Sequence, residues 1–275
     1  FCASLLNAQP MGFWAPHSLV QDAKRHGVVV RSVDINASRA DATLEECGES
    51  TGGLAVRLGV GSVRGLSSAV AHEIETHRPF ANMEDLVRKV PQLHIAQLEA
   101  LATAGAFNES FGQQRRDALW SAGAVIQSRP DRLLGVTTGA ASPQLPGMQP
   151  IDEMIADLWA TGVASSGHPT EFLRVELARM GVATAAELPM CGARGDEKVL
   201  VAGTVTHRQR PATAQGVTFI SLEDETGLIN VVCSQGCWIR YRKAAHGAGA
   251  LLVRGRLEVG DGGVINVVAE HIATL

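Results

Sequence analysis

The segment Arg64-Gly65-Leu66-Ser67 has the residue types of a turn that joins two short helices and binds phosphate. In a helix-hairpin-helix, such a turn exposes backbone N–H groups at the start of the second helix, where they and the helix dipole hold a phosphate oxygen. The usual turn reads glycine, apolar residue, glycine, and Ser67 replaces the second glycine. We therefore predict a sequence-independent but weakened DNA contact. The alternative is a plain helical hairpin in which Gly65 only allows close packing.

A second group of candidate DNA-binding residues lies beyond residue 198. Barrels of the OB type bind single strands through a basic groove and aromatic side chains on which bases stack. Arg254 and Arg256 are two apart in a predicted strand, so they share one face, which could also be an ordinary solvated face. Phe219 is either a stacking platform or a core residue. The candidates are Arg208, Arg210, Phe219, Arg240, Arg242, Arg254 and Arg256.

Acidic, histidine and cysteine residues are present, but their spacing predicts neither a catalytic centre nor a metal site. Glu223-Asp224-Glu225 fall in one predicted turn, whereas a metal-dependent polymerase or nuclease needs carboxylates from separate elements. Cys233 and Cys237 have no second Cys/His pair at zinc-ligand spacing. Gly59-Val60-Gly61 is too short for a phosphate loop, and His168 is predicted to be a turn residue. We therefore expect no catalytic residue, no metal ligand and no cofactor in this chain.

Helical periodicity dominates the first half of the chain. Residues 1–30 are predicted to be helical, ending in a short strand at 28–30, and residues 36–53 to form a connection. From 54 to 120 the pattern predicts two pairs of short helices, with Ser67 and Asn82 as N-terminal caps. Prolines and glycines at 128–150 indicate a linker, followed by helical segments near 151–160 and 170–180.

From residue 198 onward the pattern changes to period two. The predicted strands are 199–206, 217–223, 228–233, 250–258 and 263–271, with a helix at 235–247. Five strands with a helix after the third is the OB arrangement. The predicted fold class is therefore multi-domain α+β: a tandem helix-hairpin-helix unit followed by a five-stranded OB-type β-barrel.

Bulk composition limits the class of protein without deciding its function. The 275 residues are 45% hydrophobic and carry a formal charge of −4, so a uniformly basic DNA-coating protein is excluded while a local basic face is not. Five scattered cysteines favour reduced thiols in a cytoplasmic protein. No apolar stretch reaches the ~18 residues that a membrane span needs. Because Phe1 falls inside an apolar run, we expect a domain fragment.

The order of these segments resembles the C-family bacterial DNA polymerases. FCASLLNAQPMGFW at 1–14 looks like the closing part of their fingers domain. VRLGVGSVRGLSSAVAHEI at 56–74 and LEALATAGAF at 98–107 resemble their tandem helix-hairpin-helix. Residues 162–177 resemble the segment leading to their OB domain. THRQRPATAQGVTFISLEDETGLINVV at 206–232 is similar to the OB core of the error-prone branch of the polymerase III alpha-like subunit.

This resemblance implies a domain order and an activity. The implied domains are the end of the fingers (1–50), the tandem helix-hairpin-helix (51–120), a linker with a short helical segment (121–196) and the OB-fold domain (197–275). The implied activity is DNA synthesis past lesions in damage-induced mutagenesis, with Mg²⁺ and palm-domain aspartates upstream of residue 1. The chain alone is therefore expected to be an inactive DNA-binding and assembly region.

The resemblance also implies the partners. These are duplex DNA, held through its backbone, the single-stranded template, and a Y-family-like mutasome adaptor of the ImuB type that links to the sliding clamp indirectly. No membrane is expected, and the implied location is the bacterial cytoplasm. Two alternatives stay open: a protein-interaction module whose barrel docks mutasome partners, and the replicative alpha paralogue.

Overall fold

The computed structural model describes residues 1–12, 14–128, 133, 139, 141–191 and 198–275. Contacts divide the chain into two units, Phe1–Ser166 and Gly167–Leu275, and each is described by itself. Among the described residues, no helix is both long and apolar enough to cross a membrane. The multi-domain α+β class is confirmed, and the predicted domain boundaries at 50, 120 and 196 stay predictions.

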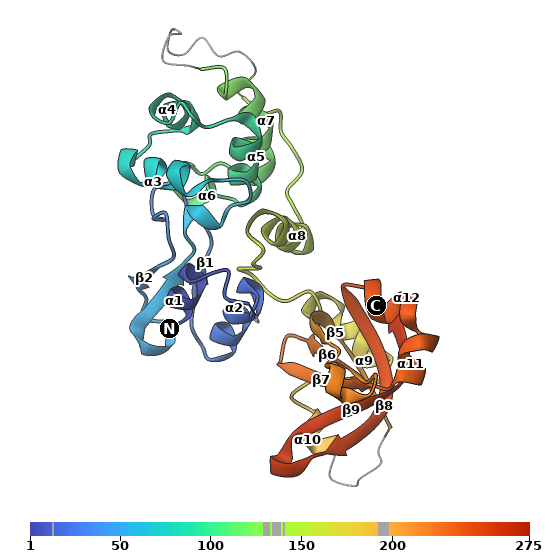
Figure 1. Ribbon diagram of the computed structural model, residues 1–275. Helices are drawn as coiled ribbons and strands as arrows, with labels where there is room; N and C mark the ends of the chain where they lie inside the picture. The colour runs from blue at the N-terminus through green and yellow to red at the C-terminus, as the bar shows by residue number, and fades with distance from the viewer. Residues whose placement is uncertain (13, 129–132, 134–138, 140, 192–197) are drawn as a thin grey trace. The chain divides into compact units, whose positions relative to one another are not determined.

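The first unit begins with two helices and a three-stranded sheet (Figure 1). The helices are α1 (Cys2–Asn7) and α2 (Pro16–Arg25). In the sheet, β1 (Val30–Arg31) pairs in parallel with the central strand β3 (Leu54–Arg57), and β2 (Thr43–Glu46) pairs with it antiparallel. The prediction of a connection at 36–53 was therefore wrong in part, because this segment contains β2. The predicted helical region also does not begin at 54, because residues 54–57 form β3.

The central strand of this sheet is held by a buried charge. The Arg57 side chain is 4% exposed and donates to both carboxylate oxygens of Glu45 on β2, at 2.9 and 3.2 Å. It also reaches Glu109 at 3.0 Å. A buried guanidinium is tolerated only when it is paired and hydrogen-bonded. This pairing joins residues far apart in the sequence, which is why local periodicity missed the strand.

Short helices follow, and their starts agree with the predicted caps. Ser67 Oγ accepts from the Val70 N–H at 3.3 Å, and Asn82 Oδ1 accepts from the Asp85 N–H at 2.9 Å. Leu86, Leu98, Leu101 and Phe107 form the fully buried centre of this region. The helices are α3 (Ser68–His77), α4 (Met83–Lys89), α5 (Ile95–Thr103), α6 (Asn108–Phe111), α7 (Arg115–Val125) and α8 (Pro150–Thr161).

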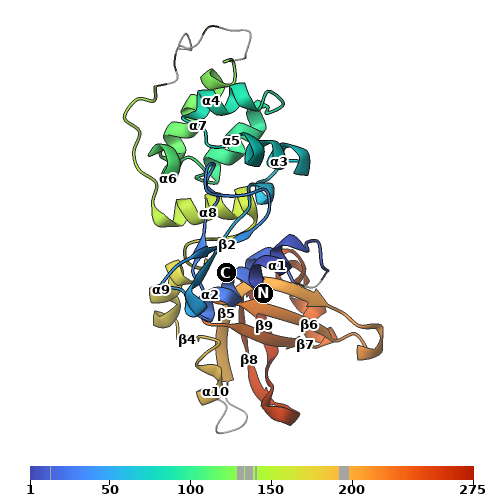
Figure 2. The same ribbon diagram turned by 90° about the vertical axis from the view of Figure 1, so that its left-hand side faces the viewer.

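Helix α8 lies at one end of the helical group formed by α3 to α7 (Figure 2). It begins with Pro150 and ends at Gly162, which takes the left-handed conformation that closes many helices. A buried ion pair fixes it: Arg115 Nη2 of α7 lies 2.5 Å from Asp157 Oδ1 of α8. Asp157 also accepts from the backbone and the hydroxyl of Ser165. The helix is therefore packed as part of the first unit.

The second unit is a closed β-barrel. Its five strands are β5 (Lys198–Gln209), β6 (Thr218–Glu223), β7 (Leu228–Cys233), β8 (Ala250–Val259) and β9 (Ile265–Thr274). They pair in the order β5-β6-β7-β9-β8, and β8 pairs again with β5 to close the barrel. The β7–β9 pairing is parallel and the others are antiparallel. This is the predicted OB arrangement.

Short elements cover the barrel. The strand β4 (Val182–Ala183) extends the sheet beside β5, and α9 (Arg174–Arg179) packs with it through Leu177. The helix α10 (Leu188–Cys191) follows β4. The predicted single helix at 235–247 is two helices, α11 (Gln235–Arg240) and α12 (Arg242–Gly247). The break falls at Tyr241, which leaves the helical region (φ −110°, ψ 23°) while its ring contacts His271.

Candidate nucleic-acid interface

The predicted hairpin turn lies directly before α3. Gly65 has φ +78°, and a Cβ built there would meet nothing within 4 Å. Glycine is therefore required by the left-handed backbone and not by close packing. Ser67 has an ordinary extended conformation (φ −79°, ψ 156°) that any residue adopts. Glycine is therefore not required at this position, and the Ser67 hydroxyl satisfies the Val70 N–H.

The start of α3 keeps backbone donors for a ligand. The first N–H groups of any helix have no acceptor within the helix. The Ser67 cap serves Val70, so the N–H groups of Ser68 and Ala69 remain as donors at the positive end of the helix dipole. Before the turn, the structure has a 3-10 turn at Val60–Ser62 in place of the predicted short helix.

Two neighbours fix the turn itself. The Arg64 N–H donates to the Ala160 carbonyl of α8 at 2.7 Å, and its guanidinium carbon lies 5.2 Å from the ring centroid of Trp159. On the other side, Gln97 Nε2 of α5 donates to the Gly65 carbonyl at 2.9 Å. The turn is thus held rigid by α5 and α8, and the charge of Arg64 rests on an aromatic face.

The Gly59-Val60-Gly61 segment has a structural role that sequence reasoning missed. A Cβ at Gly59 would lie 2.4 Å from the Ala40 carbonyl oxygen, and one at Gly61 would lie 2.8 Å from the same atom. The Val60 and Gly61 N–H groups donate to the Arg39 and Ala40 carbonyls, both at 2.9 Å. These donors are used, so the two glycines allow two backbones to approach and do not bind phosphate. In the sequence, the two closely spaced glycines were the feature that could have indicated this close backbone approach.

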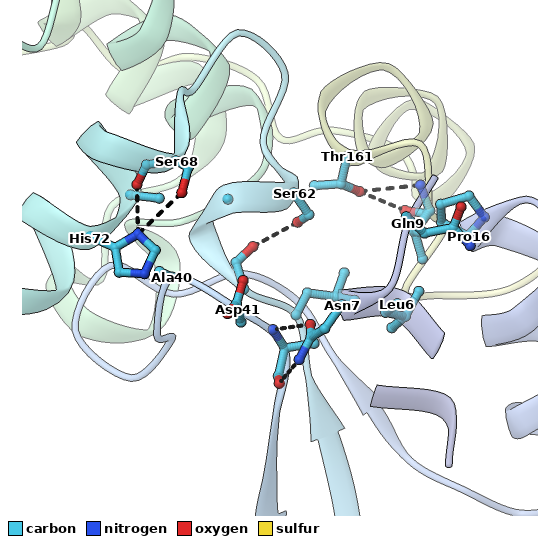
Figure 3. A pocket seen from close by; sticks show the side chains of 16 residues that line it. Leu6, Asn7, Gln9, Pro16, Ala40, Asp41, Ser62, Ser68, His72 and Thr161 are labelled. Carbon is cyan, nitrogen blue, oxygen red and sulfur yellow. Dashed lines mark hydrogen bonds between the residues drawn. The ribbon is translucent and has the colours of Figure 1, made fainter. Parts of the chain in front are cut away.

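A pocket of about 330 Å³ borders the start of α3 (Figure 3). Figure 3 shows Ser68 and His72 on one side and Gln9 and Pro16 on the other, with Ser62, Thr161 and Asn7 between them. Several of these polar groups are already engaged locally: His72 Nδ1 with the Ser68 carbonyl at 2.7 Å, and Ser62 Oγ with the Gly59 carbonyl at 2.7 Å. These lining groups therefore stabilise the backbone around the hairpin turn, and they do not form a reactive centre.

The barrel presents Phe219 on its outer face. The side chain of Phe219 is 42% exposed on β6, whereas its neighbours Thr218 and Ile220 are buried. The strand register places Phe219 beside Val232, Val232 beside Val268, and Val268 beside Arg256. Residues directly opposite in paired strands share a face. Phe219 and Arg256 thus belong to one outward row across four strands, which resolves the choice between platform and core in favour of an exposed position.

The strand register places Arg256 in this row but not Arg254. Arg254 and Arg256 share the outer face of β8, but Arg254 lies opposite Leu200, on the side that α9 and β4 cover. Arg256 Nε lies 3.6 Å from Glu270, which is also 3.7 Å from Lys198. Arg210 is exposed in the connection between β5 and β6, and Arg240 and Arg242 are exposed on α11 and α12.

Arg208 has a role that the sequence did not indicate. Its Nε donates to the Ala245 carbonyl at 2.7 Å, and its Nη2 donates to the Ala248 carbonyl. The side chain therefore ties the end of α12 to the end of β5. Burial lowers the pKa of this guanidinium. Because these donors bind backbone, Arg208 acts as a structural clasp in this conformation.

Comparisons with known proteins agree with both regions. Residues 27–118 match a family described as "Helix-hairpin-helix motif", and residues 199–275 match one described as "OB-fold nucleic acid binding domain". Among solved structures, asparaginyl-tRNA synthetase from Pyrococcus horikoshii is 20% identical, with coverage of 34% of this chain and 22% of that chain. Its TM-score of 0.29 is too low to support an argument.

The chain is similar over its whole length to curated proteins named "Error-prone DNA polymerase". The relative from Mycobacterium bovis is 52% identical over 280 residues, that from Nocardia farcinica 51% over 286 residues, and that from Corynebacterium efficiens 45% over 275 residues. Each alignment covers 100% of this chain but only 24–25% of the relative. The chain therefore belongs to the error-prone DNA polymerase family, and it spans about a quarter of the length of the relatives it matches.

Proposed function

We propose that this chain is the DNA-binding and assembly region of a DNA polymerase that acts in damage-induced mutagenesis and translesion synthesis in the bacterial cytoplasm. The observation that carries the proposal is the pairing, in one chain, of free N–H donors at the start of α3 with an OB barrel that exposes Phe219. The first suits the phosphates of duplex DNA, because backbone donors hold phosphate without reading sequence. The second suits the single-stranded template, because exposed aromatic rings stack bases of any kind.

Nucleotide transfer is not part of this proposal for the chain by itself. The family implies Mg²⁺, but the clustered carboxylates here are engaged elsewhere. Asp224 accepts from the N–H groups of Thr226 and Gly227, at 2.8 and 2.9 Å, and Glu225 pairs with Arg174. Carboxylates committed to a turn and an ion pair do not fit a catalytic metal site. We therefore expect this chain, alone, not to extend a primer.

A titration of DNA with the whole chain tests the binding. Fluorescence anisotropy of a labelled primer–template is measured over a series of salt concentrations. The logarithm of the binding constant should fall linearly with the logarithm of the salt concentration, with a slope of about −0.9 for each duplex phosphate contacted. The Ser68 and Ala69 donors are backbone groups, so Ser68→Pro, which removes one N–H at the first helical position, is the informative variant. The Ser68→Ala variant keeps the N–H and serves as its control.

Absence of binding at about 50 mM salt, where phosphate contacts are strong, would reject the proposal. Equal affinities of the two Ser68 variants would instead show that the start of α3 does not contact the duplex.

A second candidate function is docking of the mutasome adaptor through the barrel, with the sliding clamp reached only indirectly. The observation in its favour is apolar exposure on the outer face, where Phe219 and Leu228 are each 42% exposed. A pull-down with the adaptor, compared before and after Phe219→Ala and a charge reversal at Arg254 and Arg256, separates the two functions. Loss of adaptor binding with DNA binding intact would assign the face to protein.

A further inference from the structure

Charge is unevenly distributed along the chain. Residues 198–275 carry eight Lys or Arg against six Asp or Glu, a formal charge of +2, whereas residues 1–197 carry 16 against 22, a charge of −6. Within the barrel, half of the acidic residues are consecutive: Glu223 ends β6, and Asp224 and Glu225 follow it in the β6–β7 turn. From 226 to 257 the sequence holds no acidic residue and five basic ones. The barrel is therefore polarised although the chain as a whole is acidic.

The folded barrel places these groups at its two ends. The acidic turn begins at Glu223, the last residue of β6, whereas the β5–β6 connection precedes the first residue of that strand. That connection lies against α11, since a Cβ at Gly216 would be 3.1 Å from the Gln235 side chain. Arg208, at the end of β5, holds the end of α12 through the Ala245 carbonyl. The connection, α11 and α12 thus share the end of the barrel that is opposite to the acidic turn.

The two short helices form a fixed platform at this end (Figure 1). Ser234 Oγ accepts from the Cys237 N–H at 3.2 Å and caps α11. Trp238 and Tyr241 are partly buried against the barrel core, and the Tyr241 ring lies 4.7 Å from that of His271. With these side chains turned inward, Ile239 is 67% exposed.

The basic side chains of this platform are exposed. Arg240, Arg242 and Lys243 all lie at the surface. In the described part of the second unit, the ion pairs involve Arg174, Lys198 and Arg256. None of them involves the three basic residues of α11 and α12. The barrel's available positive charge therefore lies on α11 and α12 more than on strand β8.

We propose that Arg240, Arg242 and Lys243 form a phosphate-binding surface for single-stranded DNA, which continues from the row of Phe219 over α11 and α12. The inference rests on the proposed function and adds the path of the strand. The row ends near the start of these helices, because Val232 of that row is two residues before Ser234, the cap of α11. Single-stranded nucleic acid presents both stacking bases and phosphates, and a basic surface beside an exposed ring fits both.

The test uses the whole chain and a labelled oligothymidylate. The variant R240Q/R242Q/K243Q removes the three charges, and R240K/R242K, which keeps them, is the matched control. If three contacts are lost, the slope of log K against log salt should fall by about 2 for a single strand, with affinity reduced by at least about tenfold at low salt. The charge-conserving variant should keep the slope of the unmodified chain. Circular dichroism checks that each variant is folded.

The outcomes separate this inference from the proposed function. If the unmodified chain binds no DNA at low salt, the proposed function fails. If the unmodified chain binds and the glutamine variant keeps both its affinity and its slope, only the path over α11 and α12 is overturned. A glutamine variant that binds oligothymidylate normally but no longer binds polyglutamate overturns the inference in favour of an acidic protein partner.

Discussion

The guanidinium carbon of Arg64 lies 5.2 Å from the ring centroid of Trp159, so the charge nearest the hairpin turn rests on an aromatic face of α8. The same helix accepts the Arg64 N–H through the Ala160 carbonyl. Helix α8 therefore sets the orientation of the Arg64 side chain in the absence of DNA. We therefore expect a change in α8 to alter how Arg64 contacts duplex DNA.

Replacing the ring tests this connection. We expect Trp159→Ala to cost about 0.5–1 kcal/mol of stability through the lost cation–π contact, in addition to the lost apolar packing. The released Arg64 should then be mobile, and Arg64→Ala in that background should change duplex affinity by a different factor than in the unmodified chain. Anisotropy titrations of the four proteins give this coupling. Ile155→Ala, an exposed residue one turn earlier on α8, is the control. Additive effects of the two changes would show that α8 does not influence Arg64.

The buried pair of Arg115 and Asp157 should be sensitive to loss of one partner. Their side chains are 8% and 5% exposed and 2.5 Å apart. We expect Arg115→Met to destabilise the first unit by about 3–5 kcal/mol, because it leaves the Asp157 carboxylate buried and unpaired. Urea unfolding followed by tryptophan fluorescence measures the change. Arg116→Met removes the neighbouring arginine, which makes an exposed hydrogen bond to Pro146, and should cost less than 1 kcal/mol, as is typical of surface contacts. Similar losses in the two variants would contradict the prediction.

Gly255 should be intolerant of any side chain. A Cβ there would lie 2.3 Å from the Val268 carbonyl oxygen of the adjacent strand, at the irregular register between Arg254 and Gly255. Gly255→Ala should therefore destabilise the barrel by about 1–3 kcal/mol, the usual range for overpacking. Gly260→Ala, where the nearest atom is 3.6 Å away and φ is −81°, is the matched control. Thermal unfolding of both variants decides the matter, and equal melting temperatures would refute the clash.

The ion pair of Arg174 and Glu225 predicts a pH dependence. Burial alone would raise the pKa of Glu225, but hydrogen bonds from Arg174 and Thr170 outweigh it and lower the pKa below its usual value of 4.5. A carboxyl with a lowered folded pKa contributes stability above the unfolded pKa and loses it as pH falls through the folded pKa. The second unit should therefore weaken below about pH 4.5. Glu225→Gln should be less stable at pH 7 and show a shallower decline in acid. An unchanged acid decline in this variant would exclude Glu225 as a cause.

Local features of the fold followed from the sequence. The caps Ser67 and Asn82 accept N–H groups three residues later, an interaction set by adjacent residues alone. The five barrel strands followed from alternation of buried and exposed residues, because side chains in a strand alternate between faces. Strand β3 did not follow, since its partners β1 and β2 lie at separate places in the chain. Its four residues, Leu54–Arg57, are too few to show alternation by themselves.

The candidate site divides in the same way. The sequence by itself determined the residue types: a glycine with a serine cap at the hairpin, one aromatic residue in the second barrel strand, and arginines around it. Only the tertiary structure decided which of these groups stay available to a ligand. Arg208 and Arg256 are both arginines on barrel strands, yet one binds the carbonyls of α12 and the other faces Glu270 in the row of Phe219. The physical reason is that a guanidinium pairs with whichever acceptors lie within about 4 Å, and distant segments supply those acceptors only after the chain has folded.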